Sequence, residues 1–281
     1  MAVALVASAT AFAAAPEIAT VGRVAERVAP PDRALLISDS AWLGIHFYGT
    51  VDAVRGFPHT LALASCRRRV VPSCTNYDDF VPATLLDVVR GEADSYSTLI
   101  VATGYNDSDR AFTSEFETIV STARSLGYRR IVWLTLRSNG VTYESPGNAG
   151  FAEVFERNNA ALAQLVASGE YPDVVIADWA TYARTPPDGW FAPDGIHLRT
   201  PGTYAAGDYI SRKLAHLDGR ACPAPLRAGE APPDPCPDPD VTGAIVDLAS
   251  VYPLDRQAPR PTFQMEFVGH GSWPDPAWWE R

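Results

Sequence analysis

The chain has 281 residues, of which 47% are hydrophobic, and its formal net charge at pH 7 is −10. This acidic balance argues against nucleic acid or an anionic membrane surface as the main partner. No apolar run reaches the roughly 20 residues that a transmembrane helix needs, so we expect no transmembrane segment. The length and the apolar content suit one large domain with extensions.

The chain begins with an apolar segment, residues 1–15, that is rich in small side chains. Within it, Ala11-Phe12-Ala13 fits the small-residue cleavage site of a signal peptide, although the usual positive charges before the apolar run are missing. We interpret residues 1–15 as a signal peptide-like segment, and we expect a secreted or extracytoplasmic protein.

Short apolar runs bounded by turn residues alternate with stretches of helical spacing along most of the chain. The predicted strands cover residues 34–37, 60–64, 97–102, 130–136 and 172–178. The predicted helices cover residues 42–55, 83–90, 112–126, 151–168 and 204–217. Strict alternation of this kind predicts an α/β fold, a three-layer α/β/α sandwich with a parallel five-stranded sheet.

The alternating pattern places one domain at residues 32–218. The remainder, residues 219–281, is rich in Pro and Asp and has no clear periodicity. We expect it to be a C-terminal extension rather than a second folded domain.

The four cysteines fall into two close pairs, Cys66 with Cys74 and Cys222 with Cys236. Four cysteines allow three pairings, and the most local one, Cys66–Cys74 and Cys222–Cys236, is expected in an exported protein. The alternative is four free buried thiols. No Cys or His spacing is typical of a zinc site, so we expect no metal.

Polar segments that could carry chemistry follow three of the apolar stretches. They are Ser38-Asp39-Ser40 after the first predicted strand, Gly104-Tyr105-Asn106-Asp107 after the third, and Asp194-Gly195-Ile196-His197 before the last helix. The carboxyl ends of parallel strands meet at one edge of a sheet, where α/β folds bind their ligands. We therefore expect these segments to lie close together.

The residue types in these segments match a nucleophilic mechanism. A Ser hydroxyl is a weak nucleophile unless a neutral imidazole takes its proton, and a carboxylate on the other ring nitrogen fixes the tautomer of that imidazole. Ser40, His197 and Asp194 could fill these roles in that order. Asn106 carries an uncharged N–H donor that could face a developing oxyanion. Taken singly, Ser40 could equally be a helix N-cap.

In their order and spacing, the three segments resemble blocks I, III and V of the SGNH (GDSL-like) hydrolase/acyltransferase superfamily. The resemblance covers about residues 34–217 and implies a flavodoxin-like sandwich. It also implies that Ser40 is the nucleophile, His197 the base and Asp194 its orienter. The oxyanion hole would include Ser40, Gly104 and Asn106.

Two positions depart from the pattern of that superfamily. Ser38 stands where block I usually opens with glycine. The block II glycine, whose backbone N–H also faces the oxyanion, has no match after the second predicted strand. Ser65 or Cys66 stands at its place, and we assign the role of this donor to Ser65.

Three further segments could belong to a binding site. Arg67-Arg68-Arg69 could hold an anionic substrate, but we interpret it as a solvated loop between two cysteines. The polar loop 138–150 and the pair Trp190-Phe191 are expected at the pocket mouth. The loop has little apolar content, which is typical of a mobile segment.

Together these features predict a secreted SGNH-type serine esterase that hydrolyses a small-molecule ester or an O-acyl group on a glycan through an acyl-Ser40 intermediate. No cofactor is expected. One alternative is an O-acyltransferase acting on a cell-wall glycan, which would use the same catalytic residues. The other is a non-catalytic carbohydrate-binding module, which a missing Ser, His or Asp would have favoured.

Overall fold

The computed structural model describes residues 32–251, apart from residues 51–52, 77–78, 94, 143–149 and 245–247. The signal peptide-like segment 1–15 and the end of the C-terminal extension lie outside the described residues. Among the described residues, none of the helices is long and apolar enough to span a membrane.

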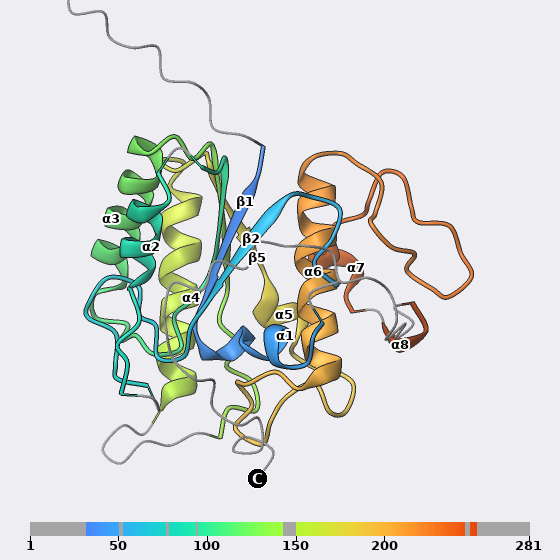
Figure 1. Ribbon diagram of the computed structural model, residues 1–281, viewed down its shortest axis with the longest axis horizontal. Helices are drawn as coiled ribbons and strands as arrows, with labels where there is room; N and C mark the ends of the chain where they lie inside the picture. The colour runs from blue at the N-terminus through green and yellow to red at the C-terminus, as the bar shows by residue number, and fades with distance from the viewer. Residues whose placement is uncertain are drawn as a thin grey trace, which may run out of the picture.

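A parallel sheet of five strands forms the middle layer, as the sequence predicts (Figure 1). The strands follow the order β2-β1-β3-β4-β5 across the sheet. Their bounds are Ala34–Ser38 for β1, His59–Leu63 for β2, Thr98–Ala102 for β3, Arg130–Leu134 for β4 and Val174–Ala177 for β5. Strands β1, β2 and β3 are buried along their whole length, which explains why they read as continuous apolar runs rather than as alternating ones.

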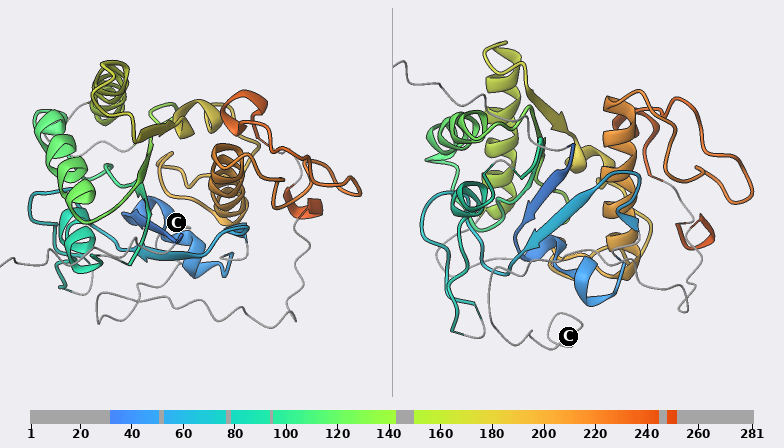
Figure 2. Two further views of the ribbon diagram at one scale, coloured as in Figure 1. Left: turned by 90° about the horizontal axis from the view of Figure 1, so that it is seen from above. Right: turned by 45° about the horizontal axis from the view of Figure 1, so that its top comes forward.

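Helices cover both faces of this sheet, which gives the predicted three-layer α/β/α sandwich (Figure 2). On one face lie α2 (Leu85–Gly91), α3 (Phe112–Ser125) and α4 (Phe151–Ala167). On the other lie α1 (Gly44–Phe47), α5 (Trp179–Tyr182) and α6 (Thr200–Leu217).

Successive residues of a strand supply the two cores, because their side chains point to opposite faces of the sheet. Leu35 and Ile37 belong to the core beneath α2 and α3, whereas Leu36 belongs to the core beneath α6. Each core is therefore built from alternate positions of the same buried strands.

The helix predicted over residues 42–55 is wrong in its length. The chain forms only a short 3₁₀ helix, η1 (Ser40–Trp42), and then α1, which ends after one turn. Gly49 follows with φ +64, the left-handed conformation that ends helices and that glycine adopts without strain. Helix α6 begins at Thr200, four residues earlier than predicted, with a proline in its first turn, where the missing N–H leaves no bond unmade.

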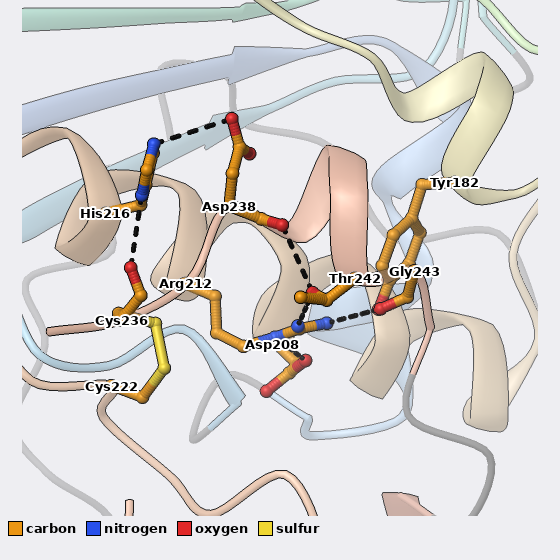
Figure 3. Close-up of a disulfide and its surroundings, with 9 residues drawn as sticks. All are labelled: Tyr182, Asp208, Arg212, His216, Cys222, Cys236, Asp238, Thr242 and Gly243. Atoms are coloured by element: carbon orange, nitrogen blue, oxygen red, sulfur yellow. Dashed lines mark hydrogen bonds and ion pairs between the residues drawn. A yellow bond between two sulfur atoms is a disulfide. The ribbon is translucent and has the colours of Figure 1, made fainter. Parts of the chain in front are cut away.

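The first part of the C-terminal extension packs against α6. It contains the Cys222–Cys236 disulfide and α7 (Pro239–Thr242), and α8 (Leu248–Val251) follows. The guanidinium of Arg212 on α6 donates to Thr242 and to the carbonyl of Gly243 (Figure 3). The expected Cys222–Cys236 pairing is thus confirmed, and so is Cys66–Cys74.

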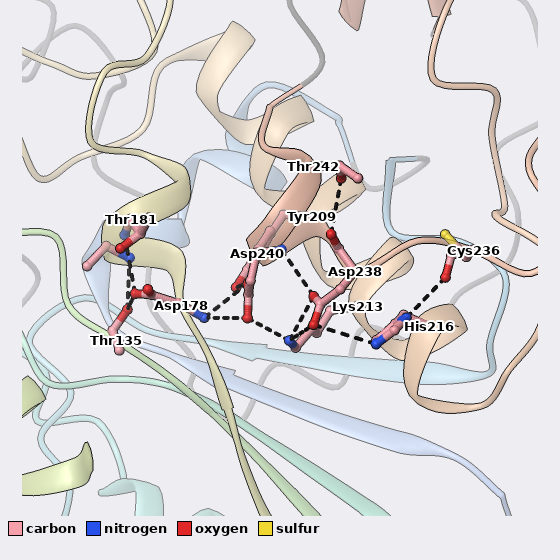
Figure 4. A network of polar contacts seen from close by, with 11 residues as sticks. Thr135, Asp178, Thr181, Tyr209, Lys213, His216, Cys236, Asp238, Asp240 and Thr242 are labelled. Carbon is pink, nitrogen blue, oxygen red and sulfur yellow. Dashed lines mark hydrogen bonds and ion pairs between the residues drawn. The ribbon is translucent and has the colours of Figure 1, made fainter. Parts of the chain in front are cut away.

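A buried lysine and two half-buried carboxylates also join α6 to the extension (Figure 4). Lys213 Nζ lies 2.9 Å from a carboxylate oxygen of Asp238 and 2.6 Å from one of Asp240. Asp240 also accepts bonds from the hydroxyl of Tyr209 and from the backbone N–H of Asp178 after β5. The extension therefore belongs to a network of hydrogen bonds and ion pairs that extends to the carboxyl end of β5.

Candidate active site

Ser40 lies at the carboxyl edge of the sheet because β1 ends two residues before it. It opens η1, and the carboxylate of Asp39 caps this helix by accepting the Ala41 N–H. The first N–H groups of a helix have no partner within the helix. The Ser40 N–H forms no hydrogen bond with any other described residue, and its side chain is half-buried.

His197 connects Ser40 to Asp194 through its two ring nitrogens. Its Nε2 lies 3.0 Å from Ser40 Oγ, and its Nδ1 lies 2.6 Å from Asp194 Oδ2. A carboxylate only accepts hydrogen bonds, so Nδ1 carries the proton and Nε2 is left to accept from the Ser40 hydroxyl. The structure brings together the three residues predicted from the separate motifs, although 157 positions separate Ser40 from His197.

Backbone contacts fix this arrangement on both sides of the imidazole. The Leu198 N–H donates to the carbonyl of Ala41, which ties the His197 segment to η1. Asp194 Oδ1 accepts the N–H groups of Ile196 at 2.8 Å and His197 at 3.1 Å. The same carboxylate therefore holds both the ring and the backbone of His197.

The electrostatic surroundings keep Asp194 ionised. Its burial by itself would raise the pKa of the carboxyl, but the hydrogen bond and the charge interaction with His197, together with the two backbone N–H groups, lower it below the ordinary 3.8. The side chains of His197 and Asp194 are 18% and 23% exposed, so this pair is accessible to water.

Asp39 lies fully buried behind Ser40. Besides the Ala41 N–H, its carboxylate accepts the backbone N–H groups of Gly104 at 2.9 Å and Tyr105 at 3.0 Å. Burial raises the pKa of Asp39 against the lowering effect of these bonds. The expectation that Gly104 donates to an oxyanion was wrong, because its N–H is bound to Asp39 instead.

The other predicted oxyanion donors lie on neighbouring strand ends. In the sheet, Ser38 of β1 is level with Leu63 of β2 and with Ala102 of β3. Ser40 and Ser65 each follow this row by two residues. The Asn106 amide donates to the Arg67 carbonyl at 3.2 Å, which joins the loop after β3 to the loop after β2.

The loop after β2 has the backbone shape that a glycine would favour. Cys66 has φ +65, one of two non-glycine residues with positive φ among those described, and its disulfide to Cys74 anchors it. The N–H groups of Ser65 and Cys66 form no hydrogen bond with another described residue. Cys66 thus has a backbone conformation that glycine favours, directly after Ser65.

The interpretation of Arg67-Arg68-Arg69 as a solvated loop was wrong for Arg67 and Arg69, which are each 1% exposed. Arg67 donates to the carbonyls of Ser38, Ala62 and Ala83. It thereby links the carboxyl ends of β1 and β2 to the segment before α2. Burial lowers the pKa of Arg67 to about 10, although the nearby carboxylate of Asp39 opposes this shift.

Arg69 forms ion pairs with two carboxylates, Asp107 Oδ2 at 3.7 Å and Glu115 Oε2 at 2.8 Å. Glu115 lies on α3, so this buried cluster joins the loop after β2 to the helix that follows β3. Arg69 therefore holds the loop after β2 against the loop after β3 and against α3, and it does not face solvent.

The expected pocket mouth also differs from the structure. Trp190 is 2% exposed and stacks on Trp179 within the core. Residues 143–149 lie outside the described part of the loop 138–150, but residues 138–142 are described and contact the backbone of residues 193–195.

Within the described ranges, no group of three or more His, Cys, Asp or Glu side chains could hold a metal ion.

Comparisons with known proteins give matches among solved structures. No family model matches the chain, and no curated protein matches its sequence. A protein from Bacteroides ovatus proposed to be a GDSL-like lipase is 16% identical with a TM-score of 0.46, and the match covers 67% of this chain and 53% of that one. The chain thus spans about half the length of the Bacteroides protein.

Two other matched structures are covered almost completely. The inhibitor-bound aryl esterase of M. smegmatis is 15% identical with a TM-score of 0.44, and the match covers 66% of this chain and 99% of that one. A protein from Agrobacterium tumefaciens proposed to be an arylesterase is 15% identical with a TM-score of 0.44, over 65% and 98% of the two chains. Further matched structures are a GDSL-like lipase from Bacteroides thetaiotaomicron and a protein from Slackia heliotrinireducens proposed to be an SGNH hydrolase.

Proposed function

We propose that this protein is a serine esterase that works through an acyl-Ser40 intermediate. One observation carries the proposal: His197 lies between Ser40, at 3.0 Å from Nε2, and Asp194, at 2.6 Å from Nδ1. A hydroxyl, an imidazole and a carboxylate joined in this order form a nucleophile, its base and the group that orients the base.

In the first half-reaction, Ser40 Oγ attacks the carbonyl carbon of the ester while its proton moves to His197 Nε2. Asp194 stabilises the imidazolium that results. The tetrahedral intermediate then collapses, the bond to the alcohol oxygen breaks, and His197 returns the proton to that oxygen. The alcohol leaves, and the acyl group stays on Ser40.

In the second half-reaction, water gives a proton to His197 Nε2 and attacks the acyl carbon. Ser40 Oγ then leaves and recovers the proton, so the carboxylic acid departs. In both halves we assign stabilisation of the oxyanion to the N–H groups of Ser40 and Ser65 and to the side-chain amide of Asn106. The support for this assignment is that these groups follow adjacent strand ends.

We further propose that the enzyme is secreted and that its substrate is a small ester or an O-acyl group on a glycan. Two disulfides support export, because such bonds persist in oxidising compartments.

The test of catalysis uses Ser40→Ala, His197→Ala and the double variant with an activated acetyl ester. Each single variant should lose several orders of magnitude in kcat while its melting temperature stays close to that of the parent. Since the residues act as a unit, the double variant should be little slower than either single one. Hydrolysis by Ser40→Ala at the parent rate would rule out the proposal.

Hydrolysis is proposed over acyl transfer because the partly exposed pair of His197 and Asp194 is open to water. A transferase has to hold water away from the acyl-enzyme until its acceptor attacks. With an acetyl ester and millimolar cell-wall sugars, the product should be mainly free acetate. Predominant acetyl-sugar would replace the esterase by an O-acyltransferase with the same nucleophile. No turnover by the parent in either assay would favour a non-catalytic carbohydrate-binding module.

A further inference from the structure

Arg137 is a buried cation at the active-site edge that the reaction above does not use. It follows β4, and it is 6% exposed. None of the described carboxylates forms an ion pair with it. Burying an uncompensated charge is costly, so the groups that do accept its hydrogen bonds indicate why it is there.

The groups that accept hydrogen bonds from the Arg137 side chain lie in or next to residues 191–198, the segment that carries Asp194 and His197. Its guanidinium donates to the carbonyl of Gly195, which lies between Asp194 and His197. Its Nε donates at 2.9 Å to the carbonyl of Ala183, directly after α5. The guanidinium carbon also lies 4.1 Å from the ring centroid of Phe191, at the start of the segment.

The backbone that follows Arg137 fits the same segment. The Thr142 N–H donates to the Asp194 carbonyl at 3.1 Å, and the Thr142 hydroxyl donates to the Pro193 carbonyl at 2.8 Å. Gly195 has φ +74, and a Cβ atom there would lie 2.1 Å from the carbonyl oxygen of Gly140. Only glycine allows the two backbones to approach so closely.

The segment also has contacts of its own: the Gly195 N–H donates to the Ala192 carbonyl, and Ile196 packs in the core beneath α6. Its ends are joined by the bridge between Phe191 and Leu198 and by the bond from the Ala192 N–H to the His197 carbonyl. Among the described residues, the hydrogen bonds that reach the backbone of residues 193–195 from outside the segment come from Arg137 and Thr142.

We propose that Arg137 is a positioning residue for the reaction, which holds the Gly195 carbonyl and so keeps Asp194 and His197 aligned with Ser40. This inference rests on the proposed function. Arg137 acts through the segment and not on the substrate, so its loss should lower kcat more than it raises KM. Misplacement of a catalytic group by about 1 Å can lower the rate on the order of 100-fold.

The test compares Arg137→Met, which keeps the length of the side chain and removes its donors, with Arg137→Lys, which keeps the charge and one bonding group. Arg212→Lys is the matched control, because Arg212 is also buried but bonds to Asp208, Tyr182 and the extension. Three quantities are measured well below each melting temperature: kcat, KM and the low-field proton NMR signal of the His197–Asp194 hydrogen bond.

Arg137→Met should lose or broaden the low-field signal and lower kcat about 10- to 100-fold with little change in KM. Arg137→Lys should fall between it and the parent. Arg212→Lys should lower the melting temperature and leave kcat and the signal unchanged.

A sharp low-field signal and parent kcat in Arg137→Met, with only the melting temperature lowered, would overturn the positioning role. If Arg137→Met does not fold, the same comparison is made with Arg137→Lys. Failure of the proposed function is recognised separately, because the parent itself would then show no hydrolysis that depends on Ser40. The NMR comparison would still decide whether Arg137 aligns His197 and Asp194.

Discussion

At the scale of single residues, Asp194 contributes to the fold as well as to the proposed chemistry. One carboxylate oxygen binds the His197 ring, and the other binds two backbone N–H groups in the turn. Both sets of bonds favour the ionised carboxylate and lower its pKa, although burial opposes them. A group whose pKa is lower in the folded than in the unfolded chain stabilises the fold while it is ionised in both states.

This shift predicts the pH dependence of the variant Asp194→Asn. The contribution of Asp194 should be fully present above the ordinary pKa of 3.8 and should decline as the pH falls through the lower folded value. The difference in unfolding free energy between parent and variant should therefore shrink as the pH falls below about 3.8. Urea unfolding at a series of pH values measures it, with the exposed Asp188→Asn as control. A difference that grows as the pH falls below about 3.8 would contradict the lowered pKa of Asp194.

A second residue-scale prediction concerns Asn106. If its amide donates to the oxyanion, Asn106→Ala should lower kcat roughly 10²- to 10³-fold and leave KM nearly unchanged. Asn106→Asp keeps the shape but replaces the N–H donors with acceptors, so it should be at least as slow. Steady-state kinetics on an activated ester give both constants. A change in KM alone would move Asn106 from stabilising the oxyanion to positioning the substrate.

At the scale of elements, the strands were predictable and the short helices were not. Five apolar runs bounded by turn residues could only be buried strands, and each lies within two residues of its predicted bounds. The stretch after Ser40 has helical spacing, but the positive φ of Gly49 overrides it. Helices α5 and α7 are single turns whose side chains fill gaps against other elements, and the sequence pattern carries no signal for such packing.

In the candidate site too, some features could be predicted from the sequence and others could not. Ser40, Asp194 and His197 could be predicted as candidates because each residue type is needed for the chemistry and each stands in a recognisable sequence motif. The bond from Gly104 to Asp39 and that from Arg137 to Gly195 join positions 65 and 58 residues apart. Which backbone group meets which side chain over such separations depends on the packed loops. An arginine directly after a buried strand was the only signal that could have pointed to Arg137.

The Cys66–Cys74 loop gives an element-scale prediction. The disulfide closes a loop across a sequence separation of 8, so its loss should destabilise the chain modestly, by about 2 kcal/mol. It also holds Cys66 at φ +65 beside Ser65, the proposed oxyanion donor. The double variant Cys66→Ser/Cys74→Ser should therefore lose more in kcat than the modest fall in melting temperature suggests. The variant Cys222→Ser/Cys236→Ser is the control, and equal losses of kcat in the two would contradict a role for the loop in catalysis.

At the scale of the whole molecule, α6 connects the active site to the C-terminal extension. The helix begins three residues after His197, and its later residues Arg212, Lys213 and His216 bind the extension (Figures 3 and 4). The extension neutralises a lysine that is only 4% exposed in its side chain. It therefore completes the fold of the domain.

Asp240→Ala tests this role of the extension. The substitution leaves the Tyr209 hydroxyl and the Asp178 N–H without this acceptor and removes one of the two carboxylates from Lys213. It should lower the unfolding free energy by about 2 to 4 kcal/mol. At temperatures where the variant is folded, kcat should stay at the parent value. Glu230→Ala in the same extension is the exposed control, and a parent-like melting temperature for Asp240→Ala would show that the network does not stabilise the fold.

The central claim is that Ser40 is a nucleophile activated by His197, and covalent labelling tests it most directly. The parent protein is incubated with a fluorophosphonate, and the modified residue is located by peptide mass spectrometry. The predicted result is one phosphonyl group per chain on Ser40, formed far more slowly in His197→Ala and absent from Ser40→Ala. A label on another residue, or an unmodified Ser40 in folded protein, would contradict the account.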